Sequence, residues 1–414
     1  MSDTRAAAPT TKPVVLTIAG SDSGGGAGIQ ADLKTIEATG GFGVSAITAV
    51  TAQNTTGVES SFPLPIEEIE AQIDAVREDF DVRAVKTGML ATAEVVETVA
   101  GYAAEFDAPV VVDPVMVATS GDRLLSEAAE AAYESLLAEA TLATPNADEA
   151  AVLTGIEPTD EASALEAGRQ LRSMGADAAL VKGGHIPGSA VLDVLVGPGG
   201  EETMSHPRID TEATHGSGCT LSATIATRLA TGSSLGTAVE RGVSFMERAV
   251  RYHHAAGEGP GAVHHLVDLR NEAGRGGAIE TVQRAIDRLA EGGGDVSGAT
   301  AEAIENVASA TPYAEAGGDV AAIDGGLTPG TDGRGSGRVR FGAAPALGAA
   351  LLEGRERDPD LRVALACRSD AGVSAALESS PCAVADVDGG GVAVLSEDLD
   401  AALEAVEAAV DRSA

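Results

Sequence analysis

Short apolar runs of strand length recur along the first two thirds of the chain, and helical patterns separate most of them. The runs are rich in Val, Ile, Leu and Ala on both faces, which is typical of strands buried in a parallel sheet. Because strand and helix return about every thirty residues, the pattern predicts a doubly wound α/β domain with a mostly parallel sheet. The runs, with the turns that follow them, are residues 13–20, 44–50, 84–90, 109–116, 140–146 and 178–185.

A Gly-rich turn follows the first run and opens a helix. Residues 21–28 read Ser-Asp-Ser-Gly-Gly-Gly-Ala-Gly, which would let a small ligand approach the backbone closely. The turn lacks the Gly-Lys-Ser/Thr of a Walker A loop and the acidic partner of a dinucleotide fingerprint, so its nucleotide signal is weak. Gln53, beyond the second run, could pair with a ring nitrogen and an exocyclic amine together, or be a solvated loop residue.

Carboxylate, amide and ammonium groups end three later runs. Asp113 follows a buried strand, where a carboxylate is costly unless Mg²⁺ or a polar network binds it. Asn146 and Glu149 open a helix, where they either reach phosphate or metal-bound water, or form a capping box. Lys182 is one of only four lysines in the chain. The carboxyl ends of parallel strands face one crevice, so we expect these groups to meet there.

Residues 214–223, Thr-His-Gly-Ser-Gly-Cys-Thr-Leu-Ser-Ala, combine a Gly-rich turn with the start of an Ala-rich helix. The unpaired N–H groups of such a helix start, at the positive end of the helix dipole, suit phosphate and the charge that develops in phosphoryl transfer. Cys219 would lie in the mouth of this pocket, where the same field is expected to lower the thiol's pKa. The alternative is an ordinary helix start tightened by glycine.

The charge of the chain excludes several classes of partner. It has 63 acidic and 27 basic residues, a net charge of −36, and such a surface repels nucleic acid and anionic membranes. The scarcity of lysine resembles the bias of halophilic archaeal proteins. With neither a run long enough to span a membrane nor a signal peptide, we expect a cytoplasmic protein. The three cysteines lack metal-ligand spacing, and a homodimer is compatible with the sequence.

We expect four segments along the chain. Residues 1–12 form an Ala-, Thr- and Pro-rich disordered tail, and residues 13–270 form the doubly wound domain. Residues 271–296 hold a helix and a Gly-rich linker. Residues 297–414 form a smaller α/β domain that is rich in Ala and Gly and has neither His nor Lys.

Seven blocks of the first domain, in this order, resemble the bacterial and archaeal hydroxymethylpyrimidine/phosphomethylpyrimidine kinases of thiamine biosynthesis, a family with the ribokinase fold. The blocks are A-G-S-D-S-G-G-G-A-G-I-Q-A-D-L-K, T-A-Q-N-T, V-K-T-G-M-L, D-P-V-M, T-P-N-A-D-E-A, V-K-G-G-H and H-G-S-G-C-T. The resemblance implies two successive ATP-dependent phosphorylations of one small pyrimidine. The first acts on its hydroxymethyl group and the second on the resulting monophosphate.

The resemblance also implies roles for individual residues. Gln53 would read the aminopyrimidine edge, and Cys219 would take the position of the catalytic base. The residues shaping the pyrimidine pocket would be Gly20, Asp22, Met89 and Val115, and those forming the anion hole would be Gly216, Ser217 and Gly218. Asp113 and Glu149 would serve Mg²⁺, while Asn146 and Lys182 would contact the phosphates of ATP.

The second domain resembles the thiamine-phosphate synthase domain that follows this kinase in some archaea. The matching pieces are D-V-A-A-I-D-G-G-L, R-F-G-A-A, L-R-V-A-L-A-C-R and the closing helix. Where that family has R-F-G-A-S and then an Arg/His pair, this chain reads Phe-Gly-Ala-Ala-Pro-Ala-Leu over residues 341–347. The synthase reaction joins two phosphorylated substrates, so loss of the basic pair predicts weak or absent synthase activity. The fold would then be a stabilising or thiamine-sensing module, although Arg338 and Arg340 leave an active synthase open.

Three other functions stay open beside the kinase. They are a bifunctional kinase and synthase, a thiamine-responsive regulator with a vestigial kinase, and a pyridoxal kinase. Pyridoxal kinases have the same fold and a related Gly-x-Gly-Cys/Asp motif. A regulator would usually need a basic DNA-binding module, and the sequence shows none.

Overall fold

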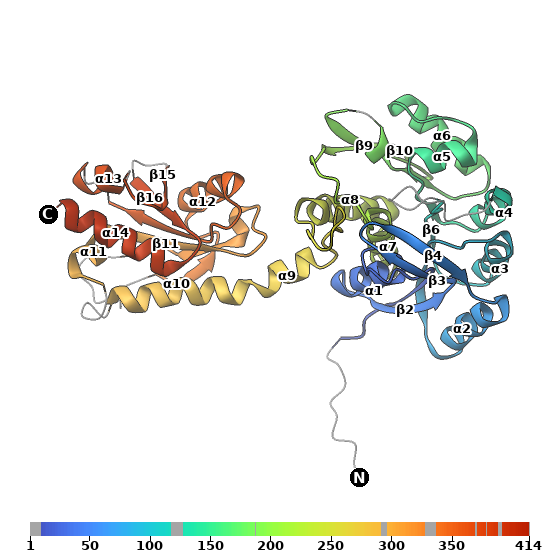
Figure 1. The fold of residues 1–414 in the computed structure, drawn as a ribbon, viewed down its shortest axis with the longest axis horizontal. Helices are drawn as coiled ribbons and strands as arrows, with labels where there is room; N and C mark the ends of the chain where they lie inside the picture. The colour runs from blue at the N-terminus through green and yellow to red at the C-terminus, as the bar shows by residue number, and fades with distance from the viewer. Residues whose placement is uncertain are drawn as a thin grey trace, which may run out of the picture. The chain divides into compact units, whose positions relative to one another are not determined.

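The computed structural model describes residues 10–116, 127–186, 188–290, 296–327, 337–368, 371–377, 379–387 and 391–413. The chain divides into two compact units, which meet in sequence between Val267 and Asp268 (Figure 1). Most of the expected tail, residues 1–9, lies outside the described part, and so does the Gly-rich stretch 291–295 of the expected linker.

An eight-stranded sheet forms the centre of the first unit, in the order β10-β9-β8-β7-β6-β5-β1-β2. The six neighbouring strands from β8 to β2 run parallel, whereas β9 is antiparallel to both of its neighbours. This confirms the doubly wound, mostly parallel sheet. The strands are β1 (Val14–Ala19), β2 (Phe42–Ile47), β5 (Val82–Thr87), β6 (Val110–Val112), β7 (Leu142–Ala143), β8 (Ala179–Val181), β9 (Ala190–Gly197) and β10 (Gly200–Pro207).

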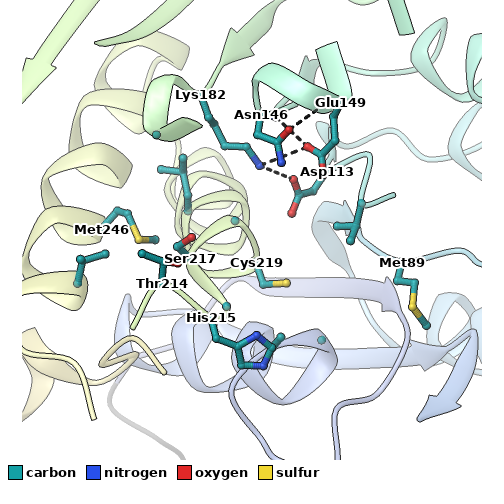
Figure 2. Close-up of a pocket in the computed structure, with 18 of the residues that line it drawn as sticks. Met89, Asp113, Asn146, Glu149, Lys182, Thr214, His215, Ser217, Cys219 and Met246 are labelled. Atoms are coloured by element: carbon teal, nitrogen blue, oxygen red, sulfur yellow. Dashed lines mark hydrogen bonds and ion pairs between the residues drawn. The ribbon is translucent and has the colours of Figure 1, made fainter. Parts of the chain in front are cut away.

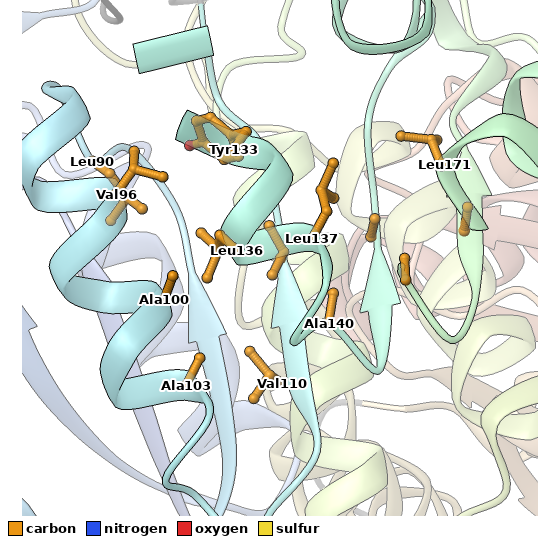
Figure 3. Close-up of a cluster of buried hydrophobic side chains, with 14 of the residues drawn as sticks. Leu90, Val96, Ala100, Ala103, Val110, Tyr133, Leu136, Leu137, Ala140 and Leu171 are labelled. Carbon is orange, nitrogen blue, oxygen red and sulfur yellow. The ribbon is translucent and has the colours of Figure 1, made fainter. Parts of the chain in front are cut away.

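Alternate residues of one strand supply two separate cores, one on each face of the sheet. In β6, Val110 and Val112 pack into one core and Val111 into the other. Figure 3 shows part of the first core, in which Val110 of the sheet and Ala103 and Leu136 of the covering helices belong to one buried cluster. The helices on this face are α2 (Ile66–Asp79), α3 (Ala93–Ala103), α4 (Glu127–Leu137), α5 (Ala147–Thr154) and α6 (Glu161–Ser173). Those on the other face are α1 (Gly28–Ala38), α7 (Ser217–Ala230) and α8 (Leu235–Arg251).

A two-stranded antiparallel ribbon follows β2 and consists of β3 (Ala49–Asn54) and β4 (Gly57–Pro63). The prediction of one strand over residues 44–50, with Gln53 in the loop beyond it, is therefore wrong. Thr48 breaks the strand because its N–H donates to the carbonyl of Ala19 and its hydroxyl donates to the carbonyl of Met89 at 2.7 Å. The chain turns there, and Gln53 is carried on β3.

The second unit contains a six-stranded antiparallel sheet in the order β13-β12-β11-β14-β16-β15. This confirms a smaller α/β domain. Helix α10, which we assigned to the linker segment, belongs to this unit, because Ala278, Val282 and Ile286 are part of its core. The strands are β11 (Ile304–Ala310), β12 (Val320–Ile323), β13 (Val339–Phe341), β14 (Val363–Cys367), β15 (Ala383–Val387) and β16 (Gly391–Ser396). The helices are α9 (Val267–Ala273), α10 (Arg275–Ala290), α11 (Gly298–Ala303), α12 (Pro345–Arg357), α13 (Ala371–Leu377) and α14 (Leu399–Ser413).

None of the helices in the described ranges has both the length and the apolar character needed to cross a bilayer.

Candidate active site

A cavity of about 810 Å³ lies at the carboxyl ends of the parallel strands, beside the N-terminus of α7 (Figure 2). This is the edge where an open parallel sheet generally holds its ligands. Every site residue selected from the sequence lines the cavity: Gly20, Asp22, Gln53, Met89, Asp113, Val115, Asn146, Glu149, Lys182, Gly216, Ser217, Gly218 and Cys219.

Three neighbouring strands bring a carboxylate, an amide and an ammonium group together. Asp113, Asn146 and Lys182 follow the ends of β6, β7 and β8, and the backbones of Asn146 and Lys182 pair in a parallel bridge. Lys182 Nζ lies 3.0 Å from Asp113 Oδ1 and 3.9 Å from Glu149 Oε2. Burial opposes the charge on Lys182, but the carboxylates of Asp113 and Glu149 outweigh it and raise the pKa of Lys182. The cavity therefore holds a fixed positive charge.

Asn146 and Glu149 form the capping box that the sequence left as one alternative. Asn146 Oδ1 accepts a hydrogen bond from the N–H of Glu149, and Glu149 Oε2 accepts one from the N–H of Asn146, both at 2.8 Å. Both residues also line the cavity, so the capping role does not remove them from it. Burial raises the pKa of Glu149 to about 7. This carboxyl group consequently changes its charge near neutral pH.

Asp113 and Glu149 suit a Mg²⁺ ion that is shared with phosphate groups. Mg²⁺ is usually bound by one or two carboxylates together with the phosphates of a substrate. Thr144 and Ser222 donate to the two oxygens of Asp113 at 3.2 and 3.3 Å and so fix its orientation. Among the described residues, no group of three or more His, Cys, Asp and Glu side chains could hold a metal ion by itself.

The start of α7 is shaped by two glycines. Gly216, the N-cap, has a φ of 81°, and a Cβ atom on it would lie 1.8 Å from the carbonyl oxygen of Gly26. A Cβ atom on Gly218 would lie 3.1 Å from Lys182 Nζ. The approach to Gly26 requires glycine at 216, whereas a Cβ atom on Gly218 would crowd the end of the Lys182 side chain. The N–H of Ser217 donates to the carbonyl of Thr214 at 3.1 Å, so the other N–H groups of this turn, next to the ammonium group, are the ones that suit a phosphate.

Cys219 belongs to the same first turn and lines the cavity, and Figure 2 shows its sulfur between Asp113 and His215. The expected lowering of its pKa is wrong. Burial raises the pKa of Cys219 to about 11, although Lys86 and the N–H of Gly28 act in the opposite direction. The charge of Lys86 and the N–H of Gly28 do not offset the loss of solvent around the sulfur, so the protonated thiol is the favoured form at neutral pH.

Gln53 and a small apolar cluster line another part of the same cavity. Gln53 Nε2 lies 3.4 Å from His215 Nε2, and Gln53 Oε1 accepts a hydrogen bond from the hydroxyl of Thr51 at 3.3 Å. Met89 packs with Val115 in an apolar cluster. A ligand here would meet an amide edge and an apolar wall, a combination that suits a flat, polar-edged ring.

Asp22 organises the Gly-rich turn. Its carboxylate accepts hydrogen bonds of 2.7 to 2.9 Å from the N–H groups of Gly24, Gly26 and Ala27, and it lies 3.1 Å from His215 Nε2. Burial opposes its ionisation, but these hydrogen bonds prevail and lower the pKa of Asp22. The carboxylate is thus used to hold the turn against His215 at the rim of the cavity.

Sequence reasoning missed several residues at the cavity. Lys86 lines it and forms a buried ion pair with Asp32, for which the only signal was the scarcity of lysine. Arg208 donates hydrogen bonds to three backbone carbonyl groups after β8, those of Gly184, Ile186 and Gly188. No sequence pattern predicts these contacts.

The sheet order and the position of the cavity are those of ribokinase-like small-molecule kinases. The chain belongs to the phosphomethylpyrimidine kinase family, since residues 22–264 match the family described as Phosphomethylpyrimidine kinase. Residues 281–394 match the family described as Thiamine-phosphate synthase ThiN, so a kinase domain is fused to a ThiN-like domain. The resemblances seen in the sequence are thereby confirmed.

The similar proteins match the first unit of this chain over nearly their own full length. The hydroxymethylpyrimidine/phosphomethylpyrimidine kinase of Streptomyces coelicolor is 50% identical over 258 residues, which are 62% of this chain and 96% of the relative. A phosphomethylpyrimidine kinase structure from Clostridium difficile matches with a TM-score of 0.52 and 39% identity over 58% of this chain and 100% of that one. A pyridoxal kinase of Bacillus subtilis, solved as an ADP complex, matches with a TM-score of 0.59 and 33% identity over 62% and 98% of the two chains.

Proposed function

We propose that this kinase phosphorylates the hydroxymethyl group of 4-amino-5-hydroxymethyl-2-methylpyrimidine and then the resulting monophosphate, with Mg²⁺ and ATP. One observation supports this most strongly: a single cavity joins the start of α7 and Lys182 to Gln53 and the Met89 wall. The test is a phosphorylation assay of the purified chain in high salt with Mg-ATP, in which the mono- and diphosphate are separated and counted. Absence of both products would overturn the proposal.

Phosphoryl transfer mostly needs its reactants to be positioned and the charge of the phosphates to be neutralised. The part of the cavity beside Lys182 and the start of α7 can do both. We assign the phosphates of ATP to Lys182, Asn146 and the N–H groups of Gly216, Gly218 and Cys219. Asp113 and Glu149 would hold Mg²⁺, which neutralises phosphate charge. Because the pKa of Glu149 is raised to about 7, its negative charge is lost as the pH falls below neutral.

The first phosphorylation needs a proton acceptor. The hydroxymethyl oxygen attacks the γ-phosphorus while the bond to ADP breaks, and the hydroxyl proton passes to the sulfur of Cys219 in its thiolate form. A thiolate with a raised pKa is a strong base, but it is rare at neutral pH. This step is accordingly expected to become faster as the pH rises.

The second phosphorylation differs in its nucleophile. A phosphate monoester has a second pKa of about 6, so at pH 7 to 8 its attacking oxygen already lacks a proton. We therefore assign Cys219 a base role in the first step and only a contact role in the second.

Gln53→Ala is expected to raise the KM for the pyrimidine by about tenfold or more and to leave the KM for ATP nearly unchanged, because a site built to hydrogen-bond a ligand binds it poorly once that group is lost. Initial-rate kinetics with each substrate varied in turn measure both constants. Gln170→Ala, at an exposed position of α6, is the matched control. Equal changes in both KM values would contradict the assignment of Gln53 to the pyrimidine.

A pyridoxal kinase is the nearest enzymatic alternative, since a pyridoxal kinase is among the similar structures. We favour the pyrimidine because the sequence family matches over residues 22–264. A direct comparison of kcat/KM for the hydroxymethylpyrimidine and for pyridoxal separates the two, and a higher value for pyridoxal would reverse the assignment.

A bifunctional kinase and synthase is the second candidate, supported by the ThiN match over residues 281–394. Arg340, one of the two arginines that kept this function open, lies 3.0 Å from Asp324 and is engaged by its own unit. An assay that supplies the pyrimidine, Mg-ATP and thiazole phosphate decides between the candidates. Thiamine phosphate would establish the synthase, and diphosphate alone would leave the second unit a stabilising or sensing role.

Truncation after Arg270 is expected to leave an active kinase, because both cores of the first unit are built from residues of that unit alone. Kinase kinetics and circular dichroism of the fragment, compared with the full chain, measure the effect. A soluble, folded fragment without activity would show that the second unit contributes to catalysis.

A further inference from the structure

A fully buried ion pair lies at the cavity and has no part in the mechanism above. Lys86 Nζ is 2.9 Å from both carboxylate oxygens of Asp32, and neither side chain has exposed surface. The hydroxyl of Thr17 donates to the same carboxylate at 2.6 Å. A buried pair loses much of its attraction to the cost of removing two charges from water. A contribution to the stability of the fold is therefore a weak explanation for this ion pair.

The pair lies where α7 packs on the sheet. Lys86 is on β5 and Asp32 on α1, and both elements contact α7, whose first turn carries Cys219. Lys86 and Cys219 line the same cavity. A Cβ atom on Gly88 would lie 2.9 Å from Lys86 Nζ, so the glycine leaves room for the ammonium group.

The charges that act on the sulfur come from several elements. Lys86 has the largest charge effect and favours the thiolate, while Asp32 and Asp113 oppose it and the N–H of Gly28 favours it. The sulfur and the ammonium group of Lys182 also attract each other, but Lys182 is engaged by Asp113 and Glu149. Of the positive charges that line this cavity, Lys86 therefore has the largest effect on the thiolate of Cys219.

Lys86 also keeps its proton. Burial opposes its charge, but Asp32, Cys219 and Asp113 together prevail and raise the pKa of Lys86. Lys86 therefore supplies a permanent charge and does not itself exchange a proton in the reaction.

We propose that Lys86 is a positioning residue for Cys219: held by Asp32, its ammonium group supplies the positive charge that stabilises the thiolate when Cys219 acts as the base. This rests on the proposed base role of Cys219. Asp32 fixes the ammonium group in place, and it opposes the thiolate less strongly than Lys86 favours it.

The test measures the thiol directly in the full chain, without nucleotide or metal. The rate of alkylation of Cys219 by iodoacetamide is followed from pH 6 to pH 10, and peptide mass spectrometry separates Cys219 from Cys367 and Cys382. Because the thiolate is the reactive form, Lys86→Met is expected to slow alkylation at pH 8 by at least about tenfold and to move the profile to higher pH. Lys12→Met, at an exposed ion pair with Glu37, is the matched control and should keep the native profile.

A second variant controls for loss of stability in Lys86→Met. Lys86→Met leaves the carboxylate of Asp32 buried without its partner, which is strongly destabilising. The double variant Lys86→Met/Asp32→Asn removes both charges without leaving a buried carboxyl group unpaired, and its alkylation is also expected to be slower than native. A native alkylation profile in either folded variant would overturn the proposal.

Kinase assays then separate this proposal from the proposed function. If both hold, kcat for the first phosphorylation falls together with the alkylation rate in the Lys86 variants, while the KM for the pyrimidine changes little. If alkylation shifts as expected but Cys219→Ala retains full activity, Lys86 still controls the thiol and the base role of Cys219 is wrong.

Discussion

Replacing Cys219 with alanine is expected to lower kcat for the first phosphorylation by about 10²- to 10⁴-fold, the range that a general base contributes. The second phosphorylation should fall much less, because the attacking phosphate oxygen needs no proton acceptor at pH 7 to 8. The two steps are measured separately by starting from the pyrimidine and from its monophosphate. In the native chain the first step should become faster with rising pH, since burial raises the pKa of Cys219 to about 11. Above pH 8, where Glu149 is expected to be ionised, this pH dependence should disappear in the alanine variant.

Cys382→Ala is the matched control, because Cys382 lies in the second unit, where its Sγ contacts the carbonyl of Ala401. It should leave both kinase steps unchanged. An equal loss of both steps in Cys219→Ala would show that the sulfur shapes the anion hole and does not accept the proton.

Gly216→Ala is expected to abolish phosphoryl transfer and to destabilise the kinase unit. The new Cβ atom would lie 1.8 Å from the carbonyl oxygen of Gly26, so the Gly-rich turn and the start of α7 must separate. Displacing the N–H donors of an anion hole costs about 10²- to 10³-fold in kcat per donor. Kinase kinetics and thermal unfolding, followed on the same preparation, measure both losses.

Gly232→Ala provides a control that isolates the collision. Gly232 has a φ of 86°, close to the 81° of Gly216, but a Cβ atom on it would meet nothing within 4 Å. Its substitution should cost only the about 1–2 kcal/mol of a left-handed non-glycine residue and leave kcat unchanged. If the two variants behaved alike, backbone strain and not the approach to Gly26 would explain the effect of Gly216→Ala.

The arrangement of the parallel sheet could be predicted because its strands are apolar on both faces and are separated by helical patterns. Val110, Val111 and Val112 pack into two cores at once, and such strands have a distinctive composition. The ribbon of β3 and β4 could not be predicted in the same way. Thr48 ends β2 through a hydrogen bond to Met89, which is far away in sequence, so the break has no local signal.

That Asp113, Asn146 and Lys182 line one cavity was predictable for a related reason. These residues end neighbouring strands, and parallel strands present their carboxyl ends at one edge. Their environment was not predictable from the sequence. The pKa of Cys219 depends on how much solvent is excluded around the sulfur, and the partner of Lys86 is set by the packing of α1 on β1, the neighbour of β5 in the sheet.

The residues that line the cavity are drawn from distant parts of the chain. The ion pair of Lys182 with Asp113 joins residues 69 positions apart, and the contact of Gln53 with His215 joins residues 162 positions apart. Contacts of such long sequence separation form late and slowly, because the chain must first close large loops. Recovery of turnover during refolding should therefore lag behind the recovery of helical signal, and enzymatic activity would report the last cooperative step in which the sheet is completed.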